Sequence, residues 1–262
     1  MAEPPFLARN VPLLDPGSLT KLRGVDKPIV ILRAGDAAAP VAARRGEFAA
    51  WIVRGAREAW PGPWVVHDVR TDAALPEVTE AAAFVMTGSS CSVTERAPWM
   101  LRAEEHVRAI ARAGTPFFGI CFGHQLAAQA LGGEVTKNPR GREIGTVRVR
   151  RLGDDPLFDG TPTELDVNAT HVDSVARLPP GARVLAESDR DPVQAFAVGA
   201  TIRCVQFHPE FDGDVMRGYV NARAHLIEAE GGDAEAIEAR AKDAPDAEAL
   251  LRTFVRRFVV PR

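Results

Sequence analysis

Apolar runs that alternate with helix-like segments are the feature that most restricts the fold of this chain. Residues 40–60 and 98–113 carry apolar side chains at the three- and four-residue spacing of amphipathic helices, and a shorter helical segment follows at 123–131. The apolar runs between these segments lie at 27–35, 64–69, 81–88 and 115–120. Near-continuous apolar strands joined by helices are typical of a parallel sheet that is covered on both faces. We therefore expect an α/β fold with a mostly parallel central sheet.

The pattern changes after Glu134. From there to Phe207 the segments are short and alternate between apolar and polar residues, which predicts antiparallel strands and hairpins added to the parallel sheet. Helical spacing returns in the last fifty or so residues, where the expected buried positions are Leu226, Ile227, Ala236, Ile237, Leu250, Leu251, Phe254 and Phe258.

One domain over residues 1–262 is the simplest division of the chain. It comprises a proline-containing N-terminal arm at 1–27, a catalytic core at 28–212 and a C-terminal helical extension at 213–262. The helical tail is expected to cover the core or to form a homodimer contact, and docking of another chain is a further alternative.

Composition excludes several classes of function. The formal net charge of −3, with arginines scattered along the chain, argues against nucleic acid or an anionic membrane as a partner. No apolar run reaches the roughly 18 residues of a membrane helix, and the N-terminus lacks the pattern of a signal peptide. Three cysteines without a C-x-x-C pair predict neither a disulfide framework nor structural zinc, so a cytoplasmic location is expected.

Cys121 lies at the most informative turn. An apolar strand ends in Gly119-Ile120, Cys121 follows, and Phe122-Gly123 opens a helix. This strand–turn–helix pattern is that of a nucleophile elbow, in which flanking glycines prevent steric collision at a sharp turn. The helix N-terminus then favours a thiolate, as a nucleophilic cysteine requires. A buried structural cysteine is the alternative at this position.

His208 and Glu210 form the second signal. Another apolar strand ends at Phe207 and is followed by His208-Pro209-Glu210. A histidine can carry a proton at neutral pH, and a neighbouring carboxylate can hold its tautomer and stabilise its charged form. Together with the elbow, this motif predicts a nucleophile with its base.

These two motifs, GICFGHQ and QFHPE, resemble the class I glutamine amidotransferase family over residues 28–212. The resemblance implies a flavodoxin-like three-layer sandwich and a triad of Cys121, His208 and Glu210. It also implies hydrolysis of the glutamine side-chain amide through a γ-glutamyl thioester, with release of ammonia.

Further site residues follow from the same resemblance. Gly88 and Phe122 are the expected backbone donors of the oxyanion hole, although the loop reads Thr-Gly-Ser-Ser here and Gly-Gly-Pro in many family members. The resemblance implies that the Gln125 side chain contacts the substrate. It also implies that the backbone of Thr170, His171 and Val172 holds the α-amino and α-carboxylate groups of glutamine. His171 and Asp173 lack further ligands at suitable spacing, so we expect no metal, and the resemblance implies no cofactor.

The acceptor of the ammonia is not encoded by a recognisable motif. The chain has no G-x-x-x-x-G-K-[ST] loop and no glycine-rich pyrophosphatase loop, so a synthase would be a separate chain. The segment TGSSCSVTERAPWM resembles both free-standing GMP-synthase-like amidotransferases and plant γ-glutamyl peptidases. Glutamine hydrolysis is the first hypothesis and γ-glutamyl peptide hydrolysis the alternative. A non-catalytic member of the fold is the third.

Overall fold

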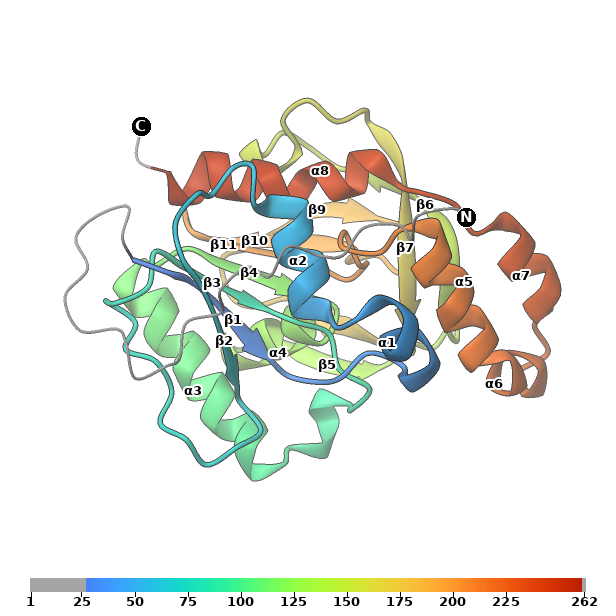
Figure 1. Cartoon of the computed structure of the whole chain (residues 1–262), viewed down its shortest axis with the longest axis horizontal. Coiled ribbons are helices and arrows are strands. Elements are labelled where there is room, and N and C mark those ends of the chain that lie inside the picture. The colour runs from blue at the N-terminus through green and yellow to red at the C-terminus, as the bar shows by residue number, and fades with distance from the viewer. Residues whose placement is uncertain (1–26, 261–262) are drawn as a thin grey trace, which may run out of the picture.

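The central sheet is built on the four strands that the sequence predicts as parallel. The computed structural model describes residues 27–260, and Figure 1 shows the arrangement of the elements. The four strands are β1 (Ile29–Arg33), β2 (Trp64–Asp68), β3 (Ala83–Met86) and β4 (Phe117–Ile120). They pair in parallel in the order β2-β1-β3-β4. Most of the expected N-terminal arm (1–27) lies outside the described residues.

Strands from the second half of the chain extend this sheet to nine, in the order β2-β1-β3-β4-β11-β10-β9-β6-β7. The added strands are β6 (Glu143–Arg151), β7 (Glu164–His171), β9 (Ala182–Glu187), β10 (Ala195–Val198) and β11 (Ile202–Val205). A separate antiparallel pair consists of β5 (Glu134–Lys137) and β8 (Asp173–Arg177).

The expectation that this whole region is antiparallel is wrong for β11. This strand pairs in parallel with β4 on one side and antiparallel with β10 on the other. All four of its residues are buried, as are those of β3 and β4. Because β4 and β11 are parallel neighbours, the segments that follow them leave the sheet at the same edge.

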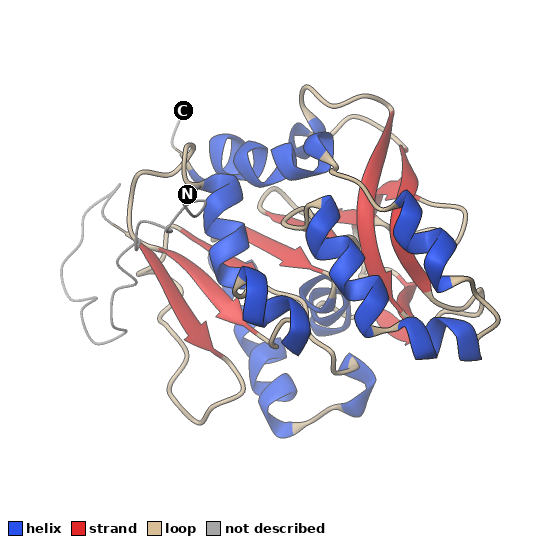
Figure 2. Cartoon of the chain, turned by 45° about the vertical axis from the view of Figure 1, so that its right-hand side comes forward, coloured by secondary structure: helices blue, strands red, loops and turns tan. Residues whose placement is uncertain are grey.

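Helices cover both faces of the sheet (Figure 2). They are α1 (Ala39–Arg45), α2 (Phe48–Ala56), α3 (Pro98–Ala113) and α4 (Phe122–Ala130). Along β1, Ile29 and Ile31 contribute to the apolar core under α1 and α2, while Val30 and Leu32 contribute to the core under α3 and α4. Two cores on opposite faces of one sheet confirm the three-layer prediction.

The single helix expected at 40–60 is two helices. Gly46 separates α1 from α2 and has φ of 80°, a left-handed conformation that glycine adopts without steric cost. By contrast, α3 spans the predicted residues and ends at Gly114 with φ of 68°. The break after α1 turns the start of α2 towards the edge where Cys121 lies.

The tail forms α5 (Gly213–Ala222), α6 (Ala224–Ala229), α7 (Ala234–Arg240) and α8 (Pro245–Phe254), and a π-helical turn follows at Val255–Val259. Helix α8 packs on the same face as α2, and the Phe254 ring lies 5.0 Å from that of Phe118. Leu226 is 39% exposed, contrary to expectation, because the short α6 buries only Ile227. Among residues 27–260, no helix is both long and apolar enough to cross a membrane.

Candidate active site

Cys121 occupies a strained turn between β4 and α4. Its φ of 51° and ψ of −100° are rare for a residue with a side chain. A Cβ at Gly119 would lie 2.7 Å from the Gly123 carbonyl oxygen, and one at Gly123 would lie 2.6 Å from the Met86 carbonyl oxygen. Both positions therefore require glycine. The predicted elbow is present, and the Cys121 side chain lies at the carboxyl edge of the sheet.

His208 reaches this edge because β11 is the neighbour of β4. The Cys121 N–H donates to the Val205 carbonyl oxygen at 2.9 Å. Three residues further along, the His208 N–H donates to the Asn168 carbonyl oxygen at 2.8 Å. The His208 Nδ1 then lies 2.8 Å from Oε1 of Glu210, and both side chains are buried. Cys121, His208 and Glu210 thus come together in space.

Aromatic rings hold the His208 imidazole in place. Phe211 stacks on it with ring centroids 4.1 Å apart, and Phe48 stacks at 5.9 Å. With Nδ1 bound to Glu210, the remaining nitrogen, Nε2, is left for the Cys121 thiol, whose pKa His208 lowers. The imidazole is therefore oriented by a carboxylate on one nitrogen and by ring stacking.

The electrostatics favour a charge-separated pair. Burial opposes ionisation of Cys121, but the charge and hydrogen bond of His208 outweigh it, with a smaller contribution from His171, and the pKa of Cys121 is lowered. Burial likewise opposes protonation of His208, but Glu210 and Cys121 raise its pKa to about 10. Both directions favour a proton on the imidazole and a negative charge on the sulfur, which is the ionisation state that a nucleophilic cysteine requires.

Gly88 follows β3 and lies against this pair. A Cβ at Gly88 would be 2.7 Å from His208 Cε1 and 3.7 Å from Cys121 Cβ. The Thr87 hydroxyl fixes the loop, since it accepts from the Ala34 N–H and donates to the Gly88 carbonyl oxygen, each at 3.0 Å. Phe122 begins α4, so its N–H has no carbonyl partner within the helix. Gly88 and Phe122, the two residues of the expected oxyanion hole, thus lie beside Cys121.

The four expected substrate-binding residues do not share one cavity. Thr170 lines the cavity of about 280 Å³ that contains Cys121 and His208. The Gln125 Nε2 instead donates to the Asp173 carbonyl oxygen and to Gln206 Oε1, both at 3.0 Å. The His171 side chain pairs with the Glu143 carboxylate, and Val172 lines a second pocket. Of these four residues, Thr170 is the one that lines the cavity beside Cys121, and the expected backbone contacts of His171 and Val172 stay predictions.

His171 forms a second buried pair, with Glu143. Its Nε2 lies 2.9 Å from Glu143 Oε2 and its Nδ1 lies 3.0 Å from the Asp173 carbonyl oxygen. Both partners are acceptors, so both ring nitrogens donate and His171 is an imidazolium. Burial opposes this charge, but Glu143 outweighs it and the pKa of His171 is raised. The sequence motif GREIG contains Glu143 without indicating this role.

The cavity beside Cys121 also contains residues that the motifs did not identify. Its lining comprises Asp36, Ala37, Ala38, Ala39, Phe48, Ser89, Ser90, Cys121, Thr170, His208, Tyr219 and Arg223. Phe48 opens α2, whereas Tyr219 and Arg223 belong to the helical tail that follows the predicted core. No local pattern around Arg223 distinguishes it from the other arginines of the chain.

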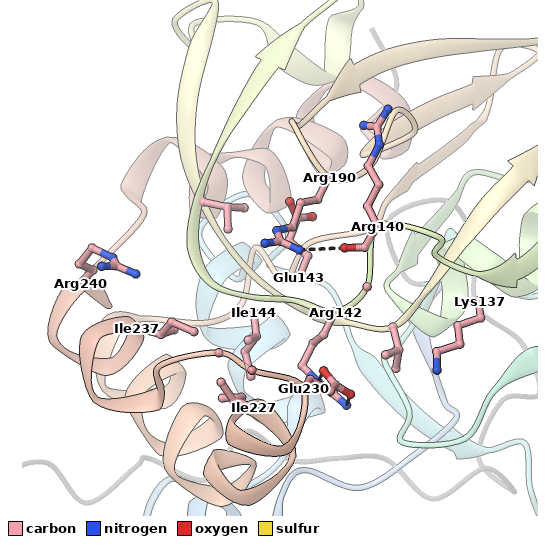
Figure 3. Close-up of a pocket in the computed structure, with 15 residues that line it drawn as sticks. Lys137, Arg140, Arg142, Glu143, Ile144, Arg190, Ile227, Glu230, Ile237 and Arg240 are labelled. Atoms are coloured by element: carbon pink, nitrogen blue, oxygen red, sulfur yellow. Dashed lines mark hydrogen bonds and ion pairs between the residues drawn. The ribbon is translucent and has the colours of Figure 1, made fainter.

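A second pocket of about 460 Å³ lies between β6 and the tail helices (Figure 3). Its charged lining residues are Lys137, Arg140, Arg142, Glu143, Arg190, Glu230 and Arg240. Arg142 pairs with Glu230 at 2.9 Å, and Arg190 donates to the Arg140 carbonyl oxygen at 2.8 Å. Cys121 does not line this pocket. Across the described part of the chain, no group of three or more His, Cys, Asp or Glu side chains is placed to hold a metal ion.

Comparisons with known proteins agree with this geometry. The sequence model of the family described as glutamine amidotransferase class-I matches residues 51–223. A GMP synthase (glutamine-hydrolysing) from Aeropyrum pernix is 36% identical over 165 residues, which cover 63% of this chain and 31% of that protein. Gamma-glutamyl peptidase 4 from Arabidopsis thaliana is 30% identical over 138 residues, which cover 51% of this chain and 55% of that protein.

The matched segment therefore spans about a third of the length of the A. pernix relative. Among solved structures, a glutamine amidotransferase from Thermotoga maritima superposes with a TM-score of 0.73 at 23% identity, covering 90% of this chain and 99% of that one. This likeness confirms the predicted flavodoxin-like fold. Because the family match covers more than half of the chain and includes Cys121 and His208, the chain belongs to the class I glutamine amidotransferase family.

Proposed function

We propose that the chain hydrolyses the side-chain amide of glutamine, with Cys121 as nucleophile, His208 as acid and base, and Glu210 as the group that orients His208. The observation that carries this proposal is the buried pair of a lowered-pKa thiol and a raised-pKa imidazole at a strained elbow. Such a pair supplies a nucleophile and a proton donor at the same position.

In the first step, the Cys121 thiolate attacks the amide carbon of glutamine. The carbonyl oxygen becomes an oxyanion, which the Gly88 and Phe122 N–H groups stabilise. The carbon–nitrogen bond then breaks as His208 gives its proton to the nitrogen, so that ammonia leaves and a γ-glutamyl thioester remains.

In the second step, His208 takes a proton from water as the water oxygen attacks the thioester carbon. Collapse of the tetrahedral species breaks the carbon–sulfur bond, releases glutamate and restores the thiolate. A reducing compartment such as the cytoplasm would keep the three free cysteines, including Cys121, as thiols.

We further propose that the ammonia passes to a synthase on a separate chain. The support is a relative from Archaeoglobus fulgidus that is named as one subunit of a glutamine-hydrolysing GMP synthase. It is 46% identical over 96 residues, which cover 36% of this chain and 52% of that protein. A homodimer through the tail stays a prediction.

A second candidate function is hydrolysis of γ-glutamyl peptides, in which an amino acid or peptide leaves in place of ammonia. The cavity of about 280 Å³ beside Cys121 favours it, because ammonia alone requires little room. The chemistry at sulfur is the same for both substrates, so the leaving group distinguishes them.

The test is a turnover assay in which purified protein and a Cys121→Ala variant each receive glutamine, glutathione and γ-glutamyl dipeptides. We expect Cys121-dependent release of glutamate, measured by mass spectrometry, with ammonia measured in parallel. Release that is equal in both proteins would contradict the proposed mechanism. Addition of the ATP-pyrophosphatase chain of a GMP synthase would reveal a dependence on a partner.

A further inference from the structure

Arg223 places a cation without a carboxylate partner in the cavity beside Cys121. Arg223 lies at the junction of α5 and α6, where its backbone N–H donates to the Val220 carbonyl oxygen at 3.1 Å. Its guanidinium lies 4.8 Å from the centre of the Tyr219 ring, and its Nη1 donates to Thr170 Oγ1. Within residues 27–260, no carboxylate oxygen lies within 4.0 Å of this guanidinium.

A largely buried guanidinium without a carboxylate partner costs free energy unless an anion binds to it. Burial lowers the pKa of Arg223, so the environment penalises its charge. The stacking on Tyr219 and the hydrogen bond to Thr170 fix the direction of the guanidinium but supply no negative charge. A planar guanidinium with free N–H groups is matched in geometry by a carboxylate.

The cavity's own acidic residue does not neutralise Arg223. Asp36 also lines the cavity, but its carboxylate is paired with Arg33 and with Arg70, the latter at 2.7 Å. The hydrogen bond from Arg70 lowers the pKa of Asp36, with a further contribution from Arg33. Asp36 is thus already compensated, and Arg223 has no carboxylate partner in the cavity.

The position of the cavity indicates which part of a substrate it receives. Its lining includes Cys121 and His208, but not Phe122, Gln125 or Val172. In the proposed mechanism His208 gives its proton to the leaving nitrogen, so the leaving group lies on the His208 side of the sulfur. Of the residues expected to bind the glutamyl half, Gln125 and Val172 lie outside this cavity and Thr170 lies at its wall.

We propose that Arg223 determines specificity by binding a carboxylate on the leaving amine, so that the substrates are γ-glutamyl amides of amino acids or short peptides. This inference rests on the proposed γ-glutamyl chemistry and names its substrate class. Thr170 and Tyr219 position the guanidinium, and residues 36–39 also line the subsite, where the Ala38 N–H donates to the Tyr219 hydroxyl at 3.2 Å.

The experiment measures binding in an inert Cys121→Ser background, so that it does not depend on turnover. Calorimetry compares γ-glutamylglycine with γ-glutamylglycinamide, which differ only in the carboxylate that Arg223 is proposed to bind. One charge-assisted bidentate contact corresponds to about tenfold or more in affinity for the acid. Arg223→Met should abolish this preference, and Arg223→Lys should restore part of it.

Arg240→Met is the matched control, because it removes a positive charge from the tail that lines the second pocket instead. Its ratio of acid to amide affinity should equal that of the parent. Circular dichroism and thermal unfolding establish that each variant is folded. Glutamine binding is measured in the same series to separate the two halves of the site.

Any of four outcomes would overturn the inference. The parent could bind the acid and the amide equally or bind neither, or the preference could survive in Arg223→Met. Alternatively, Arg223→Met could weaken glutamine as much as γ-glutamylglycine, which would assign Arg223 to the α-carboxylate of the glutamyl half. The proposed function is judged separately, by Cys121-dependent turnover of glutamine, so the two failures are distinguishable.

Discussion

Two buried histidine–carboxylate pairs lie near Cys121, and they differ in what the second ring nitrogen does. In both pairs one nitrogen lies within 2.9 Å of a glutamate oxygen, as His208 Nδ1 with Glu210 and His171 Nε2 with Glu143. In both, the carboxylate raises the histidine pKa against the effect of burial. The second nitrogen of His208 is left for Cys121, whose pKa His208 lowers, whereas that of His171 bonds the Asp173 carbonyl oxygen.

This difference assigns proton transfer to His208 and a positioning role to His171 in the proposed mechanism. In the proposed mechanism the His208 proton moves to the leaving group, because the Cys121 sulfur no longer competes for that proton once it is bonded to carbon. The His171 protons are both held by permanent acceptors, so this imidazolium contributes charge and rigidity to the segment that carries Thr170. The same pair of residue types therefore serves two roles, which the surroundings decide.

The largest expected effect comes from removing each imidazole in turn. His208→Asn should lower kcat/KM for the γ-glutamyl substrate by roughly 10⁴-fold, because the proton donor and the partner of the thiolate are both lost. His171→Asn should lower it by only about tenfold, through a weaker electrostatic effect on Cys121 and a less rigid segment. Steady-state kinetics measure both, and equal losses would remove the distinction between the pairs.

Neutralising Glu210 or Glu143 tests the same distinction between the two histidines, with smaller expected losses of activity. Glu210→Gln removes the charge that contributes most to raising the pKa of His208, so that pKa should fall. We expect a loss of about 10²-fold or more in kcat. Glu143→Gln should cost less than tenfold, since it alters His171 and not the group that transfers a proton. A larger loss in Glu143→Gln would reverse the assignment.

A substitution at Gly88 tests how closely the expected oxyanion loop approaches His208. In the comparison of the two pairs, no such loop lies against His171 among the residues that the structure describes. The Cβ of Gly88→Ala would lie 2.7 Å from His208 Cε1, so the imidazole or the loop must shift. We expect kcat to fall by roughly 10²-fold, comparable with the loss of one oxyanion donor. Gly153→Ala is the control, because a Cβ there meets no atom within 4 Å. Full activity in Gly88→Ala would contradict the proposed position of this loop.

The smallest effects are expected in the pH dependence of Cys121 alkylation. Iodoacetamide reacts with the thiolate, so the rate rises with pH through the lowered pKa of Cys121. Without the His208 imidazolium this inflection should move to higher pH. His171→Asn should move it in the same direction by less, because His171 contributes less than His208. Peptide mapping distinguishes Cys121 from Cys204, a thiol whose pKa burial raises.

Much of the fold was predictable because short-range sequence patterns specify it. The parallel strands and α3 follow from apolar spacing, and the elbow follows from the glycines on either side of Cys121. The break at Gly46 could have been anticipated from the glycine itself. The parallel pairing of β11 could not, since its apolar residues fit either a parallel or an antiparallel neighbour.

The sequence by itself determined which side chains can do chemistry: a cysteine at a turn that only glycines permit, and a histidine two residues from a glutamate. These features depend on steric and bonding constraints that act over a few residues. Only the tertiary structure decided that β11 lies beside β4, that Glu143 faces His171 and that Arg223 reaches the cavity of Cys121. The order of strands and the docking of the tail follow from how all elements bury their apolar faces together, which no short segment specifies.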